Sequence, residues 1–169
     1  MPKRFVKSAD TSTSVSKSQR ELEQILRRYG AVDFNLGSDW EKRLARVAFR
    51  VPDTPGSKML VPVRLEVSIE AVADALEFTK PRWTGGAKAK PTQHQWEQAE
   101  RVAWRHLVLW VDAACSATSA GVQTMSEAFL AHMLVKSPDG SVKKVSVLLD
   151  EVAGDGGYRA LLPAGTPAP

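Results

Sequence analysis

The chain has 169 residues, 43% hydrophobic and 25% charged, a composition typical of one soluble globular domain. No stretch approaches the roughly 18 consecutive apolar residues of a membrane span, and no apolar segment follows the basic N-terminus, so we expect no membrane partner and no secretion. The single Cys115 cannot form an internal disulfide, which indicates a reducing, cytoplasmic compartment. The net charge of +4 allows a polyanionic partner without requiring one.

The N-terminal residues predict a polar tail followed by a helix. Residues 1–15 are rich in Ser, Thr and Lys, and we expect a flexible tail there. Ser16 or Ser18 would cap a first helix that ends near Tyr29, because Gly30 follows as a terminator. The apolar residues at helical spacing that would face the core are Leu22, Ile25, Leu26 and Tyr29.

Alternating residues predict a three-stranded antiparallel β-meander. We expect strands at 31–36, 43–51 and 60–69, with a turn at Gly37-Ser38-Asp39 and a second, Pro- and Gly-rich turn after the middle strand. Pro62 indicates that the third strand lies at an edge of the sheet, since proline cannot donate to the next strand. The solvent-facing side would carry Arg46, Arg50 and Arg64.

A basic segment follows the third strand. Ser68 would cap a short helix that ends near Phe78, with a continued strand as the alternative. Residues 79–92 then contain four positive charges, no acidic residue and two consecutive glycines, so we expect a basic flexible loop.

Residues 93–120 contain no Gly or Pro and predict one long helix, around which the rest of the chain is organised. The apolar face of this predicted helix is wider than that of a helix lying on the surface of a protein. Trp104 lies off the tightest register of the buried face, so an exposed Trp104 would indicate a protein contact. The residues expected to be buried are Trp96, Ala99, Ala103, Leu107, Trp110, Ala114 and Ala117.

The sequence of the C-terminal third predicts short helices or strands. Thr124 and Glu127 form a capping-box pattern before a short helix. Residues 142–152 favour a final helix, with a strand as the alternative, and residues 154–169 predict a loose Gly- and Pro-rich tail. We therefore expect an α+β fold with one domain at 16–153: a helix, a three-stranded meander, a long central helix packed on the sheet and short helical elements at the end.

Four segments carry a resemblance to known proteins: RELEQILRRYGAVDF at 20–34, WEQAERVAWRHLVLWVDA at 96–113, GVQTMSEAFLAHMLVKSPDG at 121–140 and LLP at 161–163. Spaced as they are, they resemble a family of small, uncharacterised proteins encoded by tailed phages, prophages and other mobile elements. Residues 58–92 depart from that family's pattern. The resemblance implies a phage or mobile-element origin, a bacterial host and an accessory role, and it brings no catalytic residues. The order of elements also resembles the core of Rad52-like single-strand annealing proteins, which is a topological analogy alone.

Catalytic and metal-binding patterns are weak. Cys115 has no histidine near it in sequence and is best explained as a buried structural thiol. His94, His106 and His132 show no ligand spacing, and the glycine-rich stretches lack the setting of a phosphate loop. We therefore expect no enzyme activity, no cofactor and no metal.

Basic and aromatic residues give the remaining functional signal, and two hypotheses follow. The first is a protein that binds nucleic acid, single-stranded DNA in particular, during replication or recombination, and that could act as an oligomer. The second is a small protein-interaction module that acts on a host or phage protein, for example against a defence system. The nucleic-acid-binding residues predicted by the first are Arg46, Arg50, Arg64, Lys80, Arg82, Trp83, Lys88, Lys90, Arg101 and Arg105.

Overall fold

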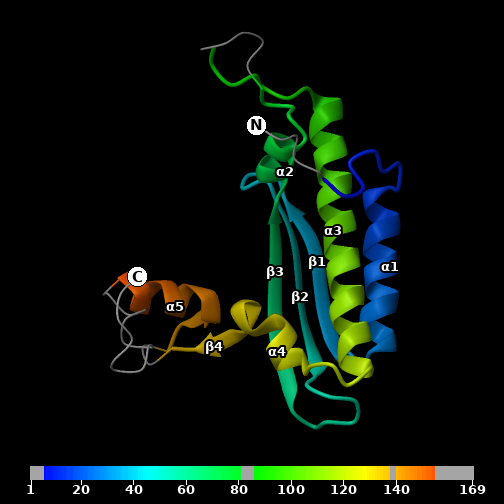
Figure 1. The fold of residues 1–169 in the computed structure, drawn as a ribbon, viewed down its shortest axis with the longest axis vertical. Helices are drawn as coiled ribbons and strands as arrows, with labels where there is room; N and C mark the ends of the chain where they lie inside the picture. Colours follow the sequence, from blue (N-terminus) through cyan, green and yellow to red (C-terminus); the bar gives the residue numbers. More distant parts are fainter. Residues whose placement is uncertain (1–5, 81–85, 138–139, 155–169) are drawn as a thin grey trace, which may run out of the picture.

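The computed structural model describes residues 6–80, 86–137 and 140–154, which form the predicted α+β fold (Figure 1). None of the helices in these ranges combines the length and apolarity needed to cross a membrane. In chain order the elements are α1 (Val15–Arg28), β1 (Asp33–Asp39), β2 (Leu44–Pro52), β3 (Leu60–Ser68), α2 (Ile69–Ala75), α3 (Gln93–Ser119), α4 (Met125–Phe129), the 3-10 helix η1 (Leu130–His132), β4 (Leu134–Lys136), β5 (Val142–Lys144) and α5 (Val145–Gly154).

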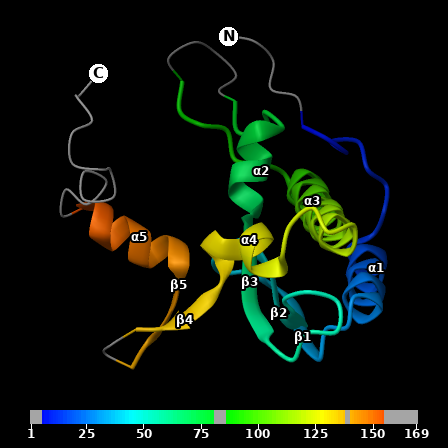
Figure 2. The same ribbon diagram turned by 60° about the horizontal axis from the view of Figure 1, so that its bottom comes forward.

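The predicted meander is present as an antiparallel sheet in the order β1-β2-β3. Pro62 lies in β3, which is an edge strand of this sheet, as expected. Helices α1 and α3 lie side by side on one face of the sheet (Figures 1 and 2). The alternating residues of the two longer strands that point toward these helices are almost fully buried: Ala45, Val47, Phe49, Val51, Val61, Val63 and Leu65.

The long helix is one unbroken element of 27 residues, α3. It begins at a capping box in which the Thr92 side chain accepts from the backbone N–H of Gln95 and the Gln95 side chain accepts from that of Thr92. Trp110, which was predicted to be buried, is 38% exposed, whereas Trp104, which lies off the tightest register of the predicted buried face, is fully buried. Since Trp104 belongs to the chain's own core, it offers no surface for a protein contact.

Two predicted boundaries are also wrong. Helix α1 is capped by Ser14 instead of Ser16 or Ser18, because the Ser14 side chain accepts from the backbone N–H of Lys17. Strand β1 starts at Asp33 and continues through Gly37-Ser38-Asp39, where a turn was predicted, and its last residue pairs with Leu44.

Part of the predicted N-terminal tail contacts the helical layer. The Gln98 side-chain amide donates to the carbonyl oxygens of Ala9 (2.8 Å) and Thr11 (3.1 Å). A ring nitrogen of His106 lies 2.8 Å from the carbonyl oxygen of Lys7. Residues 6–14 therefore cover one side of α3 and help to define its solvent-exposed surface.

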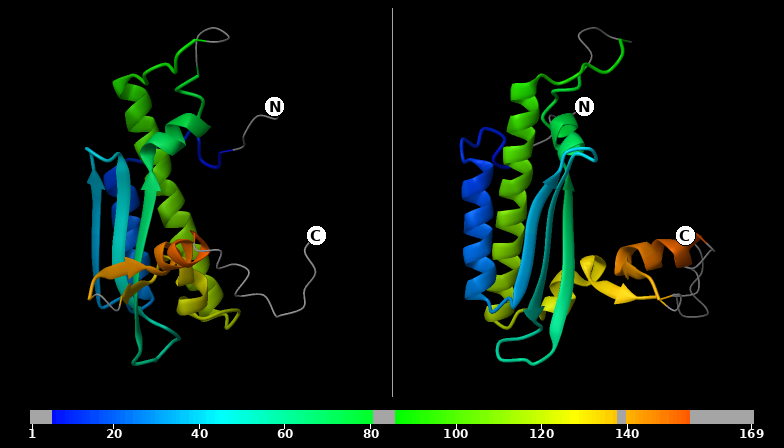
Figure 3. Two further views of the ribbon diagram at one scale, coloured as in Figure 1. Left: turned by 90° about the vertical axis from the view of Figure 1, so that its left-hand side faces the viewer. Right: turned by 180° about the vertical axis from the view of Figure 1, so that it is seen from behind.

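The short C-terminal elements project from the β3 side of the sheet, and we call residues 130–151 the C-terminal arm (Figures 1 and 3). The predicted capping box at Thr124 is present and begins α4. Both alternatives for the last segment are partly correct, since β5 forms a hairpin with β4 and runs directly into α5. The arm meets the sheet through a bridge between Met133 and Val63.

Candidate nucleic-acid interface

The predicted nucleic-acid-binding residues do not share one surface. Arg46, Arg50 and Arg64 lie on the sheet face opposite the helices, which we call the outer sheet face. Lys80 and Lys88 lie near α2, Lys90 lies two residues before the Thr92 cap of α3, and Arg101 and Arg105 belong to α3. Arg82 and Trp83 fall outside the described residues. The structure thus separates the predicted site into three parts.

On the outer sheet face, two of the three arginines are held by carboxylates. Arg50 pairs with Asp33 of the neighbouring strand, and this hydrogen bond holds the pKa of Asp33 below its usual value. Arg46 donates to Glu66 at 2.9 Å, and Lys144 of the C-terminal arm pairs with the same carboxylate. Among the described residues, only Arg64 of these arginines has no carboxylate partner.

Two lysines of the basic segment after α2 are also paired with carboxylates. Lys80 pairs with Glu77 at 2.6 Å, and Lys88 pairs with Asp74 at 2.9 Å. The hydrogen bond that Lys88 donates to Asp74 raises the pKa of Lys88, as expected for an ammonium beside a carboxylate. The segment contains no acidic residue of its own, but it lies beside Asp74 of α2 and Glu77, which follows that helix. Lys90 is exposed and makes no ion pair within the described part of the chain.

Arg101 and Arg105 of the long helix are both only partly exposed. The Arg105 side chain is only 23% exposed and pairs with Glu21 of α1. The Arg101 guanidinium donates two hydrogen bonds to the side-chain oxygen of Gln98, at 2.6 and 3.0 Å. Arg105 therefore lies at the border between α3 and α1, whereas Arg101 is held by a side chain of its own helix.

The structure adds a cationic surface that the predicted site did not include. Lys17, Arg20, Arg27 and Arg28 are all exposed on the side of α1 that faces away from the core, and we call this side the outer face of α1. Arg27 pairs with Glu23 at 2.9 Å, whereas the other three make no ion pair with any described residue. The signal that could have found this surface is the spacing: positions 17, 20, 24, 27 and 28 lie opposite the buried positions 18, 22, 25 and 26.

The outer face of α1 and the outer sheet face therefore differ in how many of their cations lack a carboxylate partner. A cation that already holds a carboxylate must exchange that partner before it can bind a phosphate, and this reduces its net contribution. Three of the four cations on the outer face of α1 are free of such a partner among the described residues, compared with Arg64 alone on the outer sheet face. The outer face of α1 is the better candidate for a polyanion.

Cys115 and His132, which were considered for catalysis or metal binding, are packed against neighbouring side chains. Cys115 is fully buried, as predicted, and loss of hydration raises the pKa of its thiol to about 12, with a smaller contribution from Asp112. The thiol is thus not ionised near neutral pH, which removes its nucleophilic form. His132 packs edge-on against Trp110, with ring centres 4.9 Å apart, and burial lowers the pKa of the imidazole.

Comparison with known proteins gives no assignment. The chain matches no protein family, no curated protein and no solved structure. A function must therefore be argued from the surfaces of this chain.

Proposed function

We propose that this protein is a non-enzymatic accessory protein of a phage or mobile element that binds single-stranded nucleic acid, with the outer face of α1 as the main contact to the phosphates. The observation that carries the proposal is the row of Lys17, Arg20 and Arg28, which are exposed and hold no described carboxylate. Helix α1 has 14 residues and therefore spans about 20 Å, enough for several phosphates of one strand. A single row of cations suits one phosphate backbone.

The size of the electrostatic contribution follows from the number of cations. Each phosphate neutralised on a single strand releases counterions, with a slope of about −0.7 in log K against log salt. Three cations would therefore contribute a slope of about −2. Binding of this kind is readily measured at low salt and weakens strongly at physiological salt.

The test is a titration of a labelled single strand at two or more salt concentrations. Replacing Lys17, Arg20 and Arg28 together by Ser should reduce the salt slope by about 2 and weaken binding at low salt at least tenfold. The matched control replaces Lys42, Lys58 and Lys136 by Ser, because these lysines are exposed, lie on other surfaces and remove the same charge. If the two triple variants weaken binding equally, the outer face of α1 is not the site.

A further variant tests the surface predicted from sequence. Replacing Arg64 by Ser removes the outer-sheet arginine that has no carboxylate partner among the described residues, and we expect a smaller loss of affinity than with the α1 variant. A wild-type protein that binds no strand at low salt, or whose binding does not change with salt, would contradict the nucleic-acid function itself.

A second candidate function is protein binding through the C-terminal arm. Its apolar side chains Leu130, Val142, Val147 and Leu149 are between 42% and 60% exposed, which is unusual for so short a segment. The wide apolar side of α3, by contrast, is buried in the chain's own core. Sedimentation of the purified protein would test self-association through the arm: association that Val147→Asp and Leu149→Asp abolish together would favour it, and a monomer at all concentrations would count against it.

A further inference from the structure

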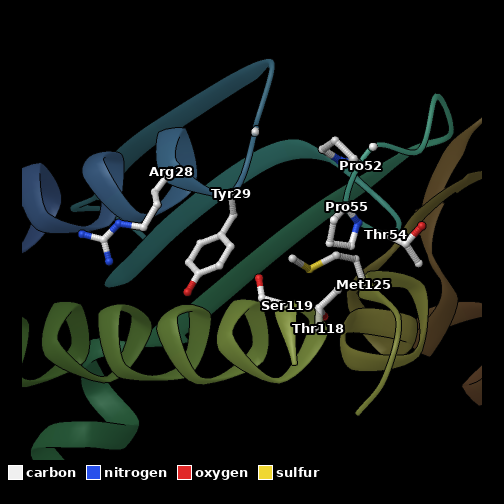
Figure 4. Close-up of a pocket in the computed structure, with 10 residues that line it drawn as sticks. Arg28, Tyr29, Pro52, Thr54, Pro55, Thr118, Ser119 and Met125 are labelled. Atoms are coloured by element: carbon white, nitrogen blue, oxygen red, sulfur yellow. The ribbon is translucent and has the colours of Figure 1, made fainter. Parts of the chain in front are cut away.

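A cavity of about 300 Å³ lies where α1 and α3 end beside the loop between β2 and β3 (Figure 4). Tyr29 stands between the end of α1 and α3, Pro52 and Pro55 come from the β2 end and the loop, and Met125 comes from α4 (Figure 4). Ser119 closes the side toward α3. The walls are thus formed mostly by a ring, two prolines and a thioether, and their size suits a small planar group.

The polar atoms of this cavity are hydroxyl groups at its edges. Thr54 and Ser119 are exposed at the opening and can donate or accept hydrogen bonds. The Tyr29 hydroxyl lies 3.2 Å from the Ser116 hydroxyl, which fixes the orientation of the ring. Apolar faces with hydrogen-bonding edges are the complement of a nucleobase, which stacks through its faces and bonds through its rim.

The charges around the cavity orient such a ligand. Arg28 leaves the last turn of α1, and its guanidinium points away from the cavity toward solvent (Figure 4). On the other side, a hollow that shares Thr54 and Ser119 with this cavity is lined by Glu127. The C-terminal ends of two helices add partial negative charge. A phosphate is therefore favoured outside, near Arg28, and an amino-bearing base edge is favoured inside.

We propose that this cavity binds one base of the single strand whose phosphates lie along the outer face of α1, with Arg28 contacting the adjoining phosphate. The inference rests on the proposed nucleic-acid function and adds to it a site for the base. It also gives a reason for preferring single strands, because a paired base cannot leave its partner without cost.

The experiment compares two labelled single strands of 12 nucleotides and equal charge. The ordinary strand carries all its bases, and the abasic strand carries none. The wild-type protein should bind the ordinary strand about tenfold more tightly, since one stacked base contributes a factor of this order. Ser119→Trp, which fills the cavity from an exposed position, should lower the affinity for the ordinary strand to that for the abasic strand and leave the abasic affinity unchanged. Thr54→Tyr fills it from the opposite side and should act in the same way.

The matched control is Ala113→Trp, an exposed position of the same helix that lies outside the cavity. It should leave both affinities unchanged. Equal binding of the two strands by the wild-type protein, or an equal effect of Ser119→Trp on both strands, would overturn the base site while leaving the phosphate surface in place. Failure of both strands to bind at low salt would instead overturn the proposed function, and the base site with it.

Discussion

At the scale of single residues, a buried carboxylate is held by a hydroxyl group 62 residues away in sequence. Glu100 of α3 is only 6% exposed and accepts from the Ser38 hydroxyl at 2.6 Å. The same hydroxyl oxygen accepts from the Trp104 indole N–H at 3.2 Å. Because burying a charged group without partners is costly, this network fixes how α3 sits on β1.

Ser38→Ala should therefore destabilise the fold by about 1–3 kcal/mol, since it leaves the Glu100 carboxylate and the Trp104 N–H without this partner. Chemical denaturation monitored by tryptophan fluorescence measures the change. The exposed Ser12→Ala is the matched control and should shift the free energy of unfolding by less than about 0.5 kcal/mol. Equal effects of the two substitutions would show that the network contributes nothing.

The buried thiol of Cys115 should make the stability of the protein depend on pH. The folded protein keeps the thiol proton up to a pKa of about 12, whereas the unfolded chain loses it near 9.0. Because the unfolded state binds fewer protons in that interval, stability should fall as pH rises from about 9 toward 12. Cys115→Ala should show a smaller decrease over this interval, and a thiol reagent should label the wild-type protein only after denaturation. Rapid labelling of the native protein would contradict the burial.

At the scale of elements, one carboxylate joins three strands. Glu66 of β3 accepts from Arg46 of β2 and from Lys144 of β5, and its side chain is 23% exposed. Loss of hydration raises the pKa of Glu66, but the hydrogen bonds and attraction of Lys144 and Arg46 outweigh it, so the pKa lies below its usual value. This pairing ties the C-terminal arm to the sheet.

The lowered pKa of Glu66 gives a pH dependence. A carboxyl whose pKa is lower in the folded state stabilises above its unfolded pKa of 4.5, and this contribution is lost as pH falls through the folded value. Glu66→Gln should cost about 1–2 kcal/mol at pH 6, and the difference from wild type should shrink below about pH 4.5. Urea denaturation across pH 6 to 3 measures it, with the exposed Glu41→Gln as the control. A difference that stays constant with pH would exclude this role of the ion pair.

At the scale of the whole molecule, the core ends before the C-terminal arm. Every described residue that is buried and hydrophobic lies between Leu22 and Phe129. The arm is joined to the body by few contacts: the Met133–Val63 bridge, the Trp110–His132 ring pair and the ion pair of Lys144. Few buried apolar contacts predict a low free energy of local opening.

Hydrogen exchange should therefore separate the two parts. Amides of β4, β5 and α5 should exchange through openings of lower free energy than those of β2 and the middle of α3. Mass spectrometry of peptides from residues 134–151 and 99–111 provides the comparison. Identical protection in both regions would mean that the arm and the body unfold as one unit.

The local pattern of the sequence determined the elements. Period-two alternation in β2 and β3 and the capping box at Thr124 predict their positions, because side-chain direction and cap chemistry depend on neighbouring residues. The turn predicted at Gly37-Ser38-Asp39 failed because pairing with β2 and the bond from Ser38 to Glu100 favour an extended strand there. Local turn preference is weaker than such tertiary contacts.

Only the tertiary structure decided which charges remain available to a ligand. Asp33 and Arg50, Glu21 and Arg105, and Asp74 and Lys88 are 17, 84 and 14 residues apart, so no local pattern reveals their pairing. The same holds for the cavity below Tyr29, whose walls come from α1, the β2–β3 loop, α3 and α4. The sequence by itself determined how many cations the protein carries and which elements hold them. Folding determined their partners, because ion pairs depend on distances in space that the order of residues does not contain.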